Sequence, residues 1–337
     1  MTHHHHPTVS AKPMSRRNLL KTIAASSVAV GAGALLAHTG AAAAAAAAAP
    51  ATPSPLTAGT RLVPTNRVGI QMFTVRDKVA SEGFRAVLEE LADIGYSEIE
   101  FAGYTQGDVG PITVPELRGL LDDNGLRAVG SHVTLTPDNI DAQIADATAL
   151  GMPFLGQGGP IAQGTAKADW QRAAQTWNEM GQKAKAAGLT LYIHNHAGEF
   201  AYASDDPKTR IYDVLWNELD PSLVVFELDV YWAYVGQHLH GGFEPIDYVT
   251  ADPRRFPMLH LKDGRLNPDS DNGLDIIEFG AGDIPYQSFL AQLKRDRGQR
   301  FGLYEQDNAS NVAEPPHPAN SLGNARRSYA QIAALRG

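Results

Sequence analysis

Four short stretches of the 337-residue chain end in side chains that bind metals or transfer protons. They cover residues 193–200, 226–229, 259–263 and 303–307, and each follows a short apolar run that is typical of a β-strand. A parallel barrel collects the carboxyl ends of its strands on one face, so the four stretches would meet there. The spacing therefore predicts one chemical site at the mouth of a barrel.

Strand geometry indicates which of these side chains point the same way, because successive side chains alternate between the two faces of a strand. Four pairs share a face in this way: His194 with His196, Glu227 with Asp229, His260 with Lys262, and Glu98 with Glu100. An inward charge is costly unless it is paired or bound to a metal. Several inward charges at strand ends therefore favour a binding site over simple packing.

A divalent metal is the first hypothesis for this site. We expect Asp229, His260 and Glu305 to hold it, with His194 as the group from the fifth strand. The chain has no cysteine, so any metal must sit on nitrogen and oxygen ligands. Imidazole and carboxylate ligands suit Mn²⁺, Mg²⁺, Co²⁺ or Zn²⁺.

Three residues are candidates for proton transfer: Glu305, His196 and Lys262. A base must lie within hydrogen-bond reach of the proton that it removes. Lys262 could instead donate to an oxyanion, or simply pair with Glu227 or Asp263.

Four further residues are predicted to contact a carbohydrate substrate: Glu100, His132, Glu199 and Trp232. Glu100 and His132 end the second and third expected strands, and core hydrogen bonding is the alternative for both. The Trp232 ring could form an apolar wall for a sugar, and packing against helices is the alternative there.

Strand and helix patterns alternate from residue 67 onward. We expect strands over residues 68–74, 97–101, 126–132, 153–156, 189–195, 223–229, 256–262 and 301–305. Helices are expected over residues 84–94, 114–124, 137–150, 167–187, 207–219, 245–250, 284–294 and 320–335. Eight such units predict an α/β fold, a single (β/α)8 TIM barrel. A doubly wound open sheet is the alternative, but no G-x-G-x-x-G follows the first strand.

The chain divides into a signal region over residues 1–50, a linker over 51–66 and the barrel over 67–337. Ser15-Arg16-Arg17 opens a segment that looks like a twin-arginine motif, followed by an apolar run and an alanine tract. We expect export by the twin-arginine route to a periplasmic or other extracytoplasmic location. An uncleaved signal would tether the protein to the membrane. The histidines at positions 3–6 are left out of the metal argument.

The amino-acid composition indicates which kinds of molecule the chain is expected to bind. The formal net charge of −9 argues against nucleic acid, which calls for a basic face. With 43% hydrophobic residues, the chain has the composition of an ordinary globular protein. A small-molecule carbohydrate is the expected partner, and a homo-oligomer is compatible with the sequence.

Taken together, residues 67–337 resemble the sugar phosphate isomerase/epimerase superfamily, the xylose isomerase-like TIM barrels. The stretches that carry the resemblance are G-I-Q-M-F-T-V-R-D, H-N-H-x-x-E-F, E-L-D-x-Y-W, H-L-K-D and E-Q-D-N. The resemblance implies a metal held by Glu, Asp, His and Glu from the fifth to the eighth strand. Asp229, His260 and Glu305 match the last three.

The fifth strand departs from the family pattern, because this chain reads His194-Asn195-His196 where many relatives read E-N-H. Either His194 replaces the carboxylate, or Glu199 reaches back, or the metal has only three strong protein ligands. The change also removes one of the two glutamates that act as bases in the ketose epimerases.

These features predict a metal-dependent isomerase or epimerase that acts on a sugar or keto-sugar through an enediolate. A lyase or hydratase that eliminates from a 3-keto-glycoside or an inosose-like substrate is the second hypothesis. A non-catalytic exported sugar-binding barrel is the third, and an endonuclease-like enzyme is disfavoured by the charge. The acidic segment 263–283 has Arg265 as its only basic residue, which disfavours a phosphorylated substrate.

Overall fold

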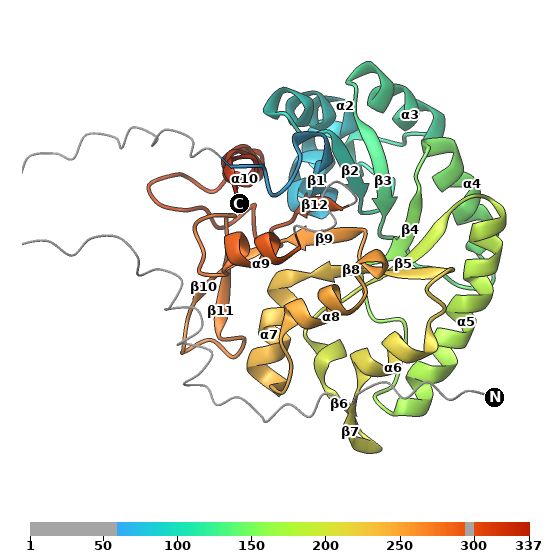
Figure 1. The fold of residues 1–337 in the computed structure, drawn as a ribbon. Coiled ribbons are helices and arrows are strands. Elements are labelled where there is room, and N and C mark those ends of the chain that lie inside the picture. The colour runs from blue at the N-terminus through green and yellow to red at the C-terminus, as the bar shows by residue number, and fades with distance from the viewer. Residues whose placement is uncertain (1–58, 294–299) are drawn as a thin grey trace, which may run out of the picture.

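Eight parallel strands form a nearly closed barrel surrounded by helices, which confirms the predicted fold class (Figure 1). The structure is a computed structural model that describes residues 59–293 and 300–337. The predicted signal region 1–50, with its export motif, and residues 51–58 of the predicted linker lie outside the described residues.

The barrel strands are short, and most of their residues are buried because helices cover the outer face while side chains fill the interior. They are β1 (Val68–Gln71), β2 (Glu98–Phe101), β3 (Arg127–Ser131), β4 (Phe154–Gln157), β5 (Thr190–His194), β8 (Val224–Asp229), β9 (Met258–Leu261) and β12 (Phe301–Tyr304). Their order in the sheet is β3-β2-β1-β12-β9-β8-β5-β4. This order places the ends of β5, β8, β9 and β12 next to one another.

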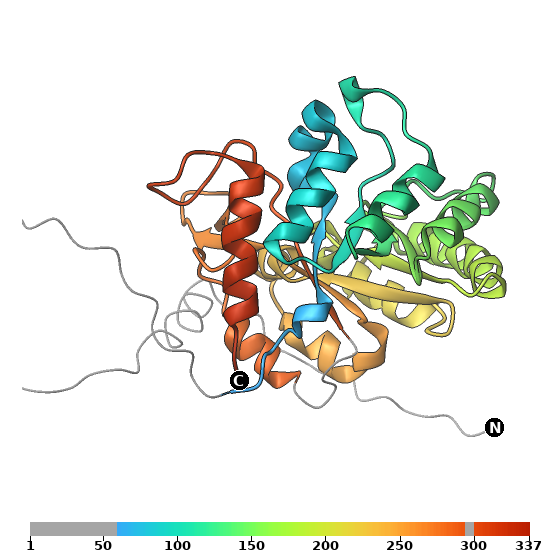
Figure 2. The same cartoon turned by 90° about the horizontal axis from the view of Figure 1, so that it is seen from above.

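The helices follow the strands along the chain. They are α2 (Arg76–Ile94), α3 (Val114–Asp123), α4 (Ile140–Leu150), α5 (Lys167–Ala186), α6 (Ile211–Glu218), α7 (Val230–His240), α8 (Pro245–Ala251), α9 (Tyr286–Gln292) and α10 (Ser321–Ala334). Figure 2 shows α10 standing beside α2, where the rings of Tyr96 and Tyr329 pack edge to face at 5.0 Å. In the described residues, no helix combines the length and apolar character that a membrane span requires.

The barrel closes between β3 and β4 through a single bridge between His132 and Gly156. A glycine is required here because a Cβ on Gly156 would lie 2.5 Å from the ring of Tyr192, which crosses the interior at this level. Below the mouth, an interior cluster fills the barrel, and its buried members are Val129, Tyr192, Val225, Met258, Phe301 and Leu303. The interior is therefore a packed core rather than a channel.

Three local predictions were wrong. Residues 207–210 of the predicted helix 207–219 belong to β7 (Asp206–Arg210), which pairs with β6 (Tyr202–Ala203) in an antiparallel hairpin. The segment 263–283, expected as a loop, contains a second hairpin of β10 (Asp263–Leu266) and β11 (Leu274–Ile277). Helix α7 was not predicted, and it begins directly after β8 because the Asp229 carboxylate accepts a hydrogen bond from the Trp232 amide at 2.9 Å.

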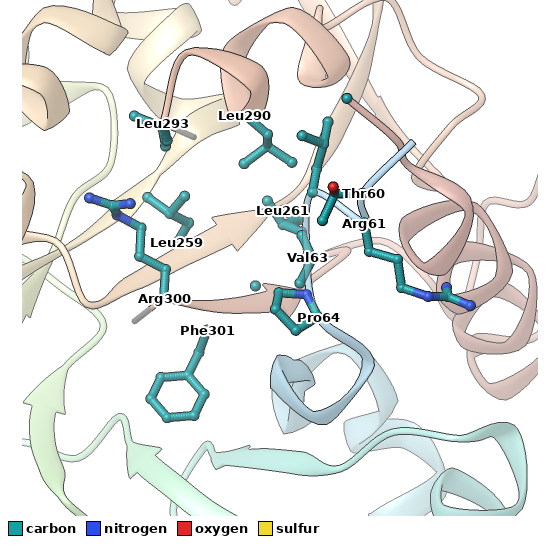
Figure 3. Close-up of a pocket in the computed structure, with 13 residues that line it drawn as sticks. Thr60, Arg61, Val63, Pro64, Leu259, Leu261, Leu290, Leu293, Arg300 and Phe301 are labelled. Atoms are coloured by element: carbon teal, nitrogen blue, oxygen red, sulfur yellow. The ribbon is translucent and has the colours of Figure 1, made fainter. Parts of the chain in front are cut away.

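The first and last described segments meet on the outside of the barrel. Residues Arg61 and Arg336 form an antiparallel bridge, and the Gly337 amide donates to the Thr60 carbonyl at 3.1 Å. A pocket lies between this N-terminal segment, α9 and the outer faces of β9 and β12, lined by Val63, Leu259 and Leu290 among others (Figure 3). None of the predicted site residues lines this pocket.

Two glycine substitutions test this description of the barrel. We expect Gly69→Ala to lower the free energy of unfolding by about 1–3 kcal/mol, because its Cβ would lie 2.8 Å from the Glu98 carbonyl oxygen inside the barrel. Gly119→Ala should raise it by up to about 1 kcal/mol, since Gly119 is exposed in α3 with no atom near its Cβ. Urea unfolding of both variants measures the difference. Equal stability of Gly69→Ala and the wild type would contradict the packing described for β1.

Candidate metal centre

The inward side chains at the ends of four neighbouring strands converge on one group at the barrel mouth. His194 ends β5, Asp229 ends β8, His260 lies in β9, and Glu305 follows β12. One ligand atom from each of these residues can be chosen so that all four lie within 4.8 Å of one another. We call these four residues the upper donor set. The apolar neighbours of these residues, such as Phe226 and Leu261, pack in the outer core.

The upper donor set has the atoms that a divalent cation would need. His260 Nδ1 lies 2.9 Å from Glu305 Oε2 and 3.8 Å from Asp229 Oδ2. His194 Nε2 lies 3.7 Å from the same Asp229 oxygen. Asp229 is fully buried, yet its Oδ2 accepts no hydrogen bond from any described residue. The Lys262 ammonium lies 3.2 Å from this oxygen, and a divalent cation among these donors would give it a direct ligand bond.

Buried carboxylates face the opposite nitrogens of the two imidazole rings. His260 Nε2 lies 2.7 Å from Glu100 Oε2, and His194 Nδ1 lies 3.2 Å from Glu227 Oε2. Metal-binding histidines usually donate their second ring N–H to such a partner, which fixes the tautomer and the ring orientation. Glu100 and Glu227 therefore orient the two rings toward the upper donor set.

The protonation of the rings follows from burial and neighbouring charge. Burial and the neighbouring histidines hold the pKa of His194 well below its usual range, so the ring is neutral and its lone pair is available. Burial also lowers the pKa of His260, but Glu227 and Glu100 outweigh it and the pKa is raised. A cation on His260 Nδ1 requires the neutral ring, so binding of the cation releases a proton.

The Lys262 ammonium lies beside the upper donor set. Its Nζ is 3.2 Å from Asp229 Oδ2, 3.1 Å from Glu305 Oε2 and 3.0 Å from Asp307 Oδ2. Burial lowers the pKa of Lys262, but the three carboxylates outweigh it and hold the pKa above its usual value. Burial alone would raise the pKa of Glu305, but the charges of Lys262 and His260 outweigh burial and lower this pKa below its usual value. Lys262 is therefore cationic and Glu305 ionised at neutral pH.

The loop after β5 bears on one of the three alternatives for the fifth strand, namely that Glu199 reaches back to the donor group. The Glu199 carboxylate accepts a hydrogen bond from the His196 amide at 2.9 Å, so it is engaged with the backbone of its own turn. The Asn195 side chain bonds both backbone groups of Asp229, at 3.1 and 3.2 Å, and ties the end of β5 to that of β8. The structure thus brings His194, and not Glu199, into the donor group.

The other predicted site residues occupy two levels. His196 and Trp232 pack edge to face at 5.4 Å toward the mouth, and the Lys262 ammonium lies 5.6 Å from the Trp232 ring centre. The buried Trp232 Nε1 donates to no described residue. Glu100 and His132 lie deeper, where His132 Nε2 contacts Glu100 at 3.2 Å and Glu227 at 2.9 Å.

Sequence reasoning missed several residues that build the site. Tyr192 donates a hydrogen bond to Glu100, and Gln71 donates another at 2.9 Å. Asp307 pairs with Lys262, for which pairing with Glu227 or Asp263 was the alternative to a role in proton transfer. Period-two alternation could have identified Tyr192 from His194 and Asp307 from Glu305, because each pair is two residues apart.

Comparison with known proteins agrees with this architecture. The sequence model of the xylose isomerase-like TIM barrel family matches residues 88–319. A solved sugar phosphate isomerase/epimerase from Parabacteroides distasonis is 24% identical with a TM-score of 0.61, over 84% of this chain and 100% of that chain. A solved L-ribulose 3-epimerase is 16% identical with a TM-score of 0.58, over 79% of this chain and 93% of its own.

One curated relative adds a different activity. An inosose dehydratase from Clostridium perfringens is 23% identical over 159 residues, which is 44% of this chain and 50% of that protein. The chain thus matches about half the length of this relative.

Removal of the His260 side chain tests the metal centre. We expect His260→Ala to lower bound Mn²⁺, Co²⁺ and Zn²⁺ to background, because His260 is fully buried and central to the donor group. The metal content of chelator-stripped and reloaded protein, measured by elemental analysis, reports the loss. His317→Ala is the matched control, since His317 is exposed. Equal metal content in His260→Ala and the wild type would exclude this centre.

Proposed function

Because the chain belongs to the xylose isomerase-like TIM barrel family, we propose that it is a metal-dependent enzyme that removes a proton next to the carbonyl of a non-phosphorylated sugar or keto-sugar. Isomerisation or epimerisation follows when the proton returns to the neighbouring carbon or to the opposite face. The observation that carries the proposal is the upper donor set, with the Lys262 ammonium in contact with two of its carboxylates.

The residues at the mouth divide the chemistry between them. When bound, a divalent cation would polarise the substrate carbonyl and offset negative charge on its oxygen. Glu305 is ionised and accepts the proton at its carboxylate. Lys262 is protonated at Nζ and donates a hydrogen bond to the substrate oxygen that becomes negative.

His196 and Trp232 border the space above these groups. Burial and Lys262 lower the pKa of His196 to about 4, so its ring is neutral at neutral pH. The neutral ring can accept a hydrogen bond from a sugar hydroxyl or donate one to it. The Trp232 ring supplies an apolar surface, and its Nε1–H supplies a donor. We assign both residues to substrate orientation.

The environment of Asp263 supports a substrate without phosphate. Barrels of this type commonly bind phosphate with backbone amides after the seventh and eighth strands. Here the Asp263 carboxylate already accepts hydrogen bonds from the amides of Gly264, Gly280, Gly282 and Ile284, at 2.8–3.4 Å. Arg265 is engaged with the Ala281 carbonyl and with Glu314. An internal carboxylate thus occupies the amides that a phosphate would use.

Dehydration by β-elimination is the second candidate function. The fifth strand offers the imidazole of His194 where a two-base epimerase would need a glutamate, so Glu305 is the one glutamate of the upper donor set. Elimination needs one base and a proton donor for the departing hydroxyl, and Glu305 and Lys262 could supply both. The similarity to inosose dehydratase points the same way.

Deuterium incorporation distinguishes these reactions. We expect Mn²⁺-loaded protein in deuterated water to place deuterium next to the carbonyl of an aldose, a ketose or a 3-keto-glycoside. A product that is an isomer or epimer of the substrate, unchanged in mass apart from the deuterium, supports the first function. A product that has lost water or the aglycone supports the second. NMR and mass spectrometry of the products measure both. Sugar binding with no exchange and no product across these classes would identify a binding protein instead.

Lys262→Met tests the role of the ammonium. We expect kcat to fall by about 10²–10⁴ because a proton or hydrogen-bond donor is lost while the four metal donors remain. Steady-state kinetics at saturating Mn²⁺, with bound Mn²⁺ measured in parallel, reports the effect. Lys183→Met is the matched control, because Lys183 is paired with Asp141 on the surface. Unchanged kcat in Lys262→Met would remove this residue from the mechanism.

A further inference from the structure

We propose that the barrel holds a second, deeper cation position formed by His132, His194, Glu227 and His260. These four residues are the deeper donor set. Their ligand atoms can also be chosen to lie within 4.8 Å of one another. Glu227 precedes Asp229 by two residues in β8, so the deeper donor set lies one step further into the barrel.

The geometry of this group centres on one carboxylate oxygen. Glu227 Oε2 lies 2.9 Å from His132 Nε2, 3.2 Å from His194 Nδ1 and 3.2 Å from His260 Nε2. Three ring nitrogens from three different strand ends thus meet at a single oxygen. Together with this oxygen, the three nitrogens supply the four donors that a tetrahedral nitrogen and oxygen site requires.

Hydrogen bonding alone leaves this arrangement incomplete. Glu227 is fully buried, and its second oxygen, Oε1, accepts no hydrogen bond from any described residue. Glu100, the other carboxylate at this level, accepts hydrogen bonds from Gln71 and Tyr192 and a third from His260 Nε2 at 2.7 Å, and only this third bond would be lost to a cation on that nitrogen. The three imidazoles contact Oε2 of Glu227, so a cation bound by this carboxylate would offset the negative charge that Oε1 shares with Oε2.

The two donor sets differ in the ion that they favour. The deeper donor set offers three imidazoles and one carboxylate, a set that suits Zn²⁺. The upper donor set offers two imidazoles and two carboxylates, and it is better suited to Mn²⁺ or Mg²⁺. The deeper donor set is buried except for His132, whose side chain is 13% exposed.

The two positions exclude each other because they share two rings. His194 and His260 face the upper donor set with one nitrogen and Glu227 with the other. A neutral imidazole has one free lone pair, so each ring serves one cation at a time. The two positions therefore hold one ion between them, either Zn²⁺ in the deeper position or Mn²⁺ in the upper one. Zn²⁺ in the deeper position would leave Asp229 and Glu305 paired with the Lys262 ammonium and without a divalent cation.

Two substitutions separate the positions. Asp229→Asn removes a carboxylate from the upper donor set, and we expect Mn²⁺ affinity to fall at least about tenfold while Zn²⁺ affinity stays within about threefold. Adding His132→Phe in that background should lower Zn²⁺ affinity at least about tenfold, because the ring shape is kept and the nitrogen is lost. Asp229→Asn with His317→Phe is the matched control and should keep Zn²⁺. Competition with a chelating dye gives the affinities.

Further measurements keep the test decisive. If the His132→Phe double variant does not fold, as judged by circular dichroism, Glu227→Gln in the Asp229→Asn background replaces it with the same expectation. Elemental analysis of wild type in excess Zn²⁺ plus Mn²⁺ should find one ion per chain. Equal loss of both ions in Asp229→Asn, or retained Zn²⁺ in the double variants, would overturn the deeper position. One Zn²⁺ and one Mn²⁺ bound together would overturn the mutual exclusion. These binding measurements use no substrate, so failure of the proposed reaction would leave them unaffected.

Discussion

The site depends on the constraint that two imidazole rings are held between buried carboxylates on both sides. His260 contacts Glu305 through Nδ1 and Glu100 through Nε2, and it has no exposed surface. Such a ring cannot turn without breaking a charged contact on either side, which would cost several kcal/mol in a buried position. The rings are therefore rigid ligands, and their orientation is set by residues of β2, β8 and the end of β12.

The barrel itself is adapted to keep these carboxylates in place. Tyr192 spans the interior and donates to Glu100, and its ring fits only because Gly130 and Gly156 have no side chains at that level. The weakest seam of the barrel, between β3 and β4, lies at the same level, where His132 forms the closing bridge. The two glycines thus make room for Tyr192, which holds Glu100 in place beneath the metal donors.

Much of this arrangement could be predicted from sequence. Alternation along strands and the collection of strand ends on one face placed His194, Asp229, His260 and Glu305 together, because both rules depend only on spacing. The distance of each site residue from the barrel mouth could not be predicted, since it depends on the register between strands. Glu100 and His132 were expected to contact a substrate, but they lie among the interior carboxylates and histidines. Helix α7 was missed because no loop separates it from β8. Asp229 both ends the strand and caps the first turn of the helix.

Compared with the Glu, Asp, His, Glu set that the family resemblance implies, His194 changes the charge of the proposed centre. A Glu, Asp, His, Glu set carries three negative charges and keeps one of them after binding a divalent cation. The set of His194, Asp229, His260 and Glu305 carries two, so a divalent cation makes it neutral. Lys262 and Asp307 add one positive and one negative charge beside it, with the ammonium also in contact with Asp229 and Glu305. A neutral centre withdraws electrons from a substrate carbonyl more strongly than an anionic one, since less negative charge from the ligands opposes the cation. His194 also directs its Nδ1 toward Glu227, beside the nitrogens of His132 and His260, so the proposed deeper donor set includes the histidine at this position.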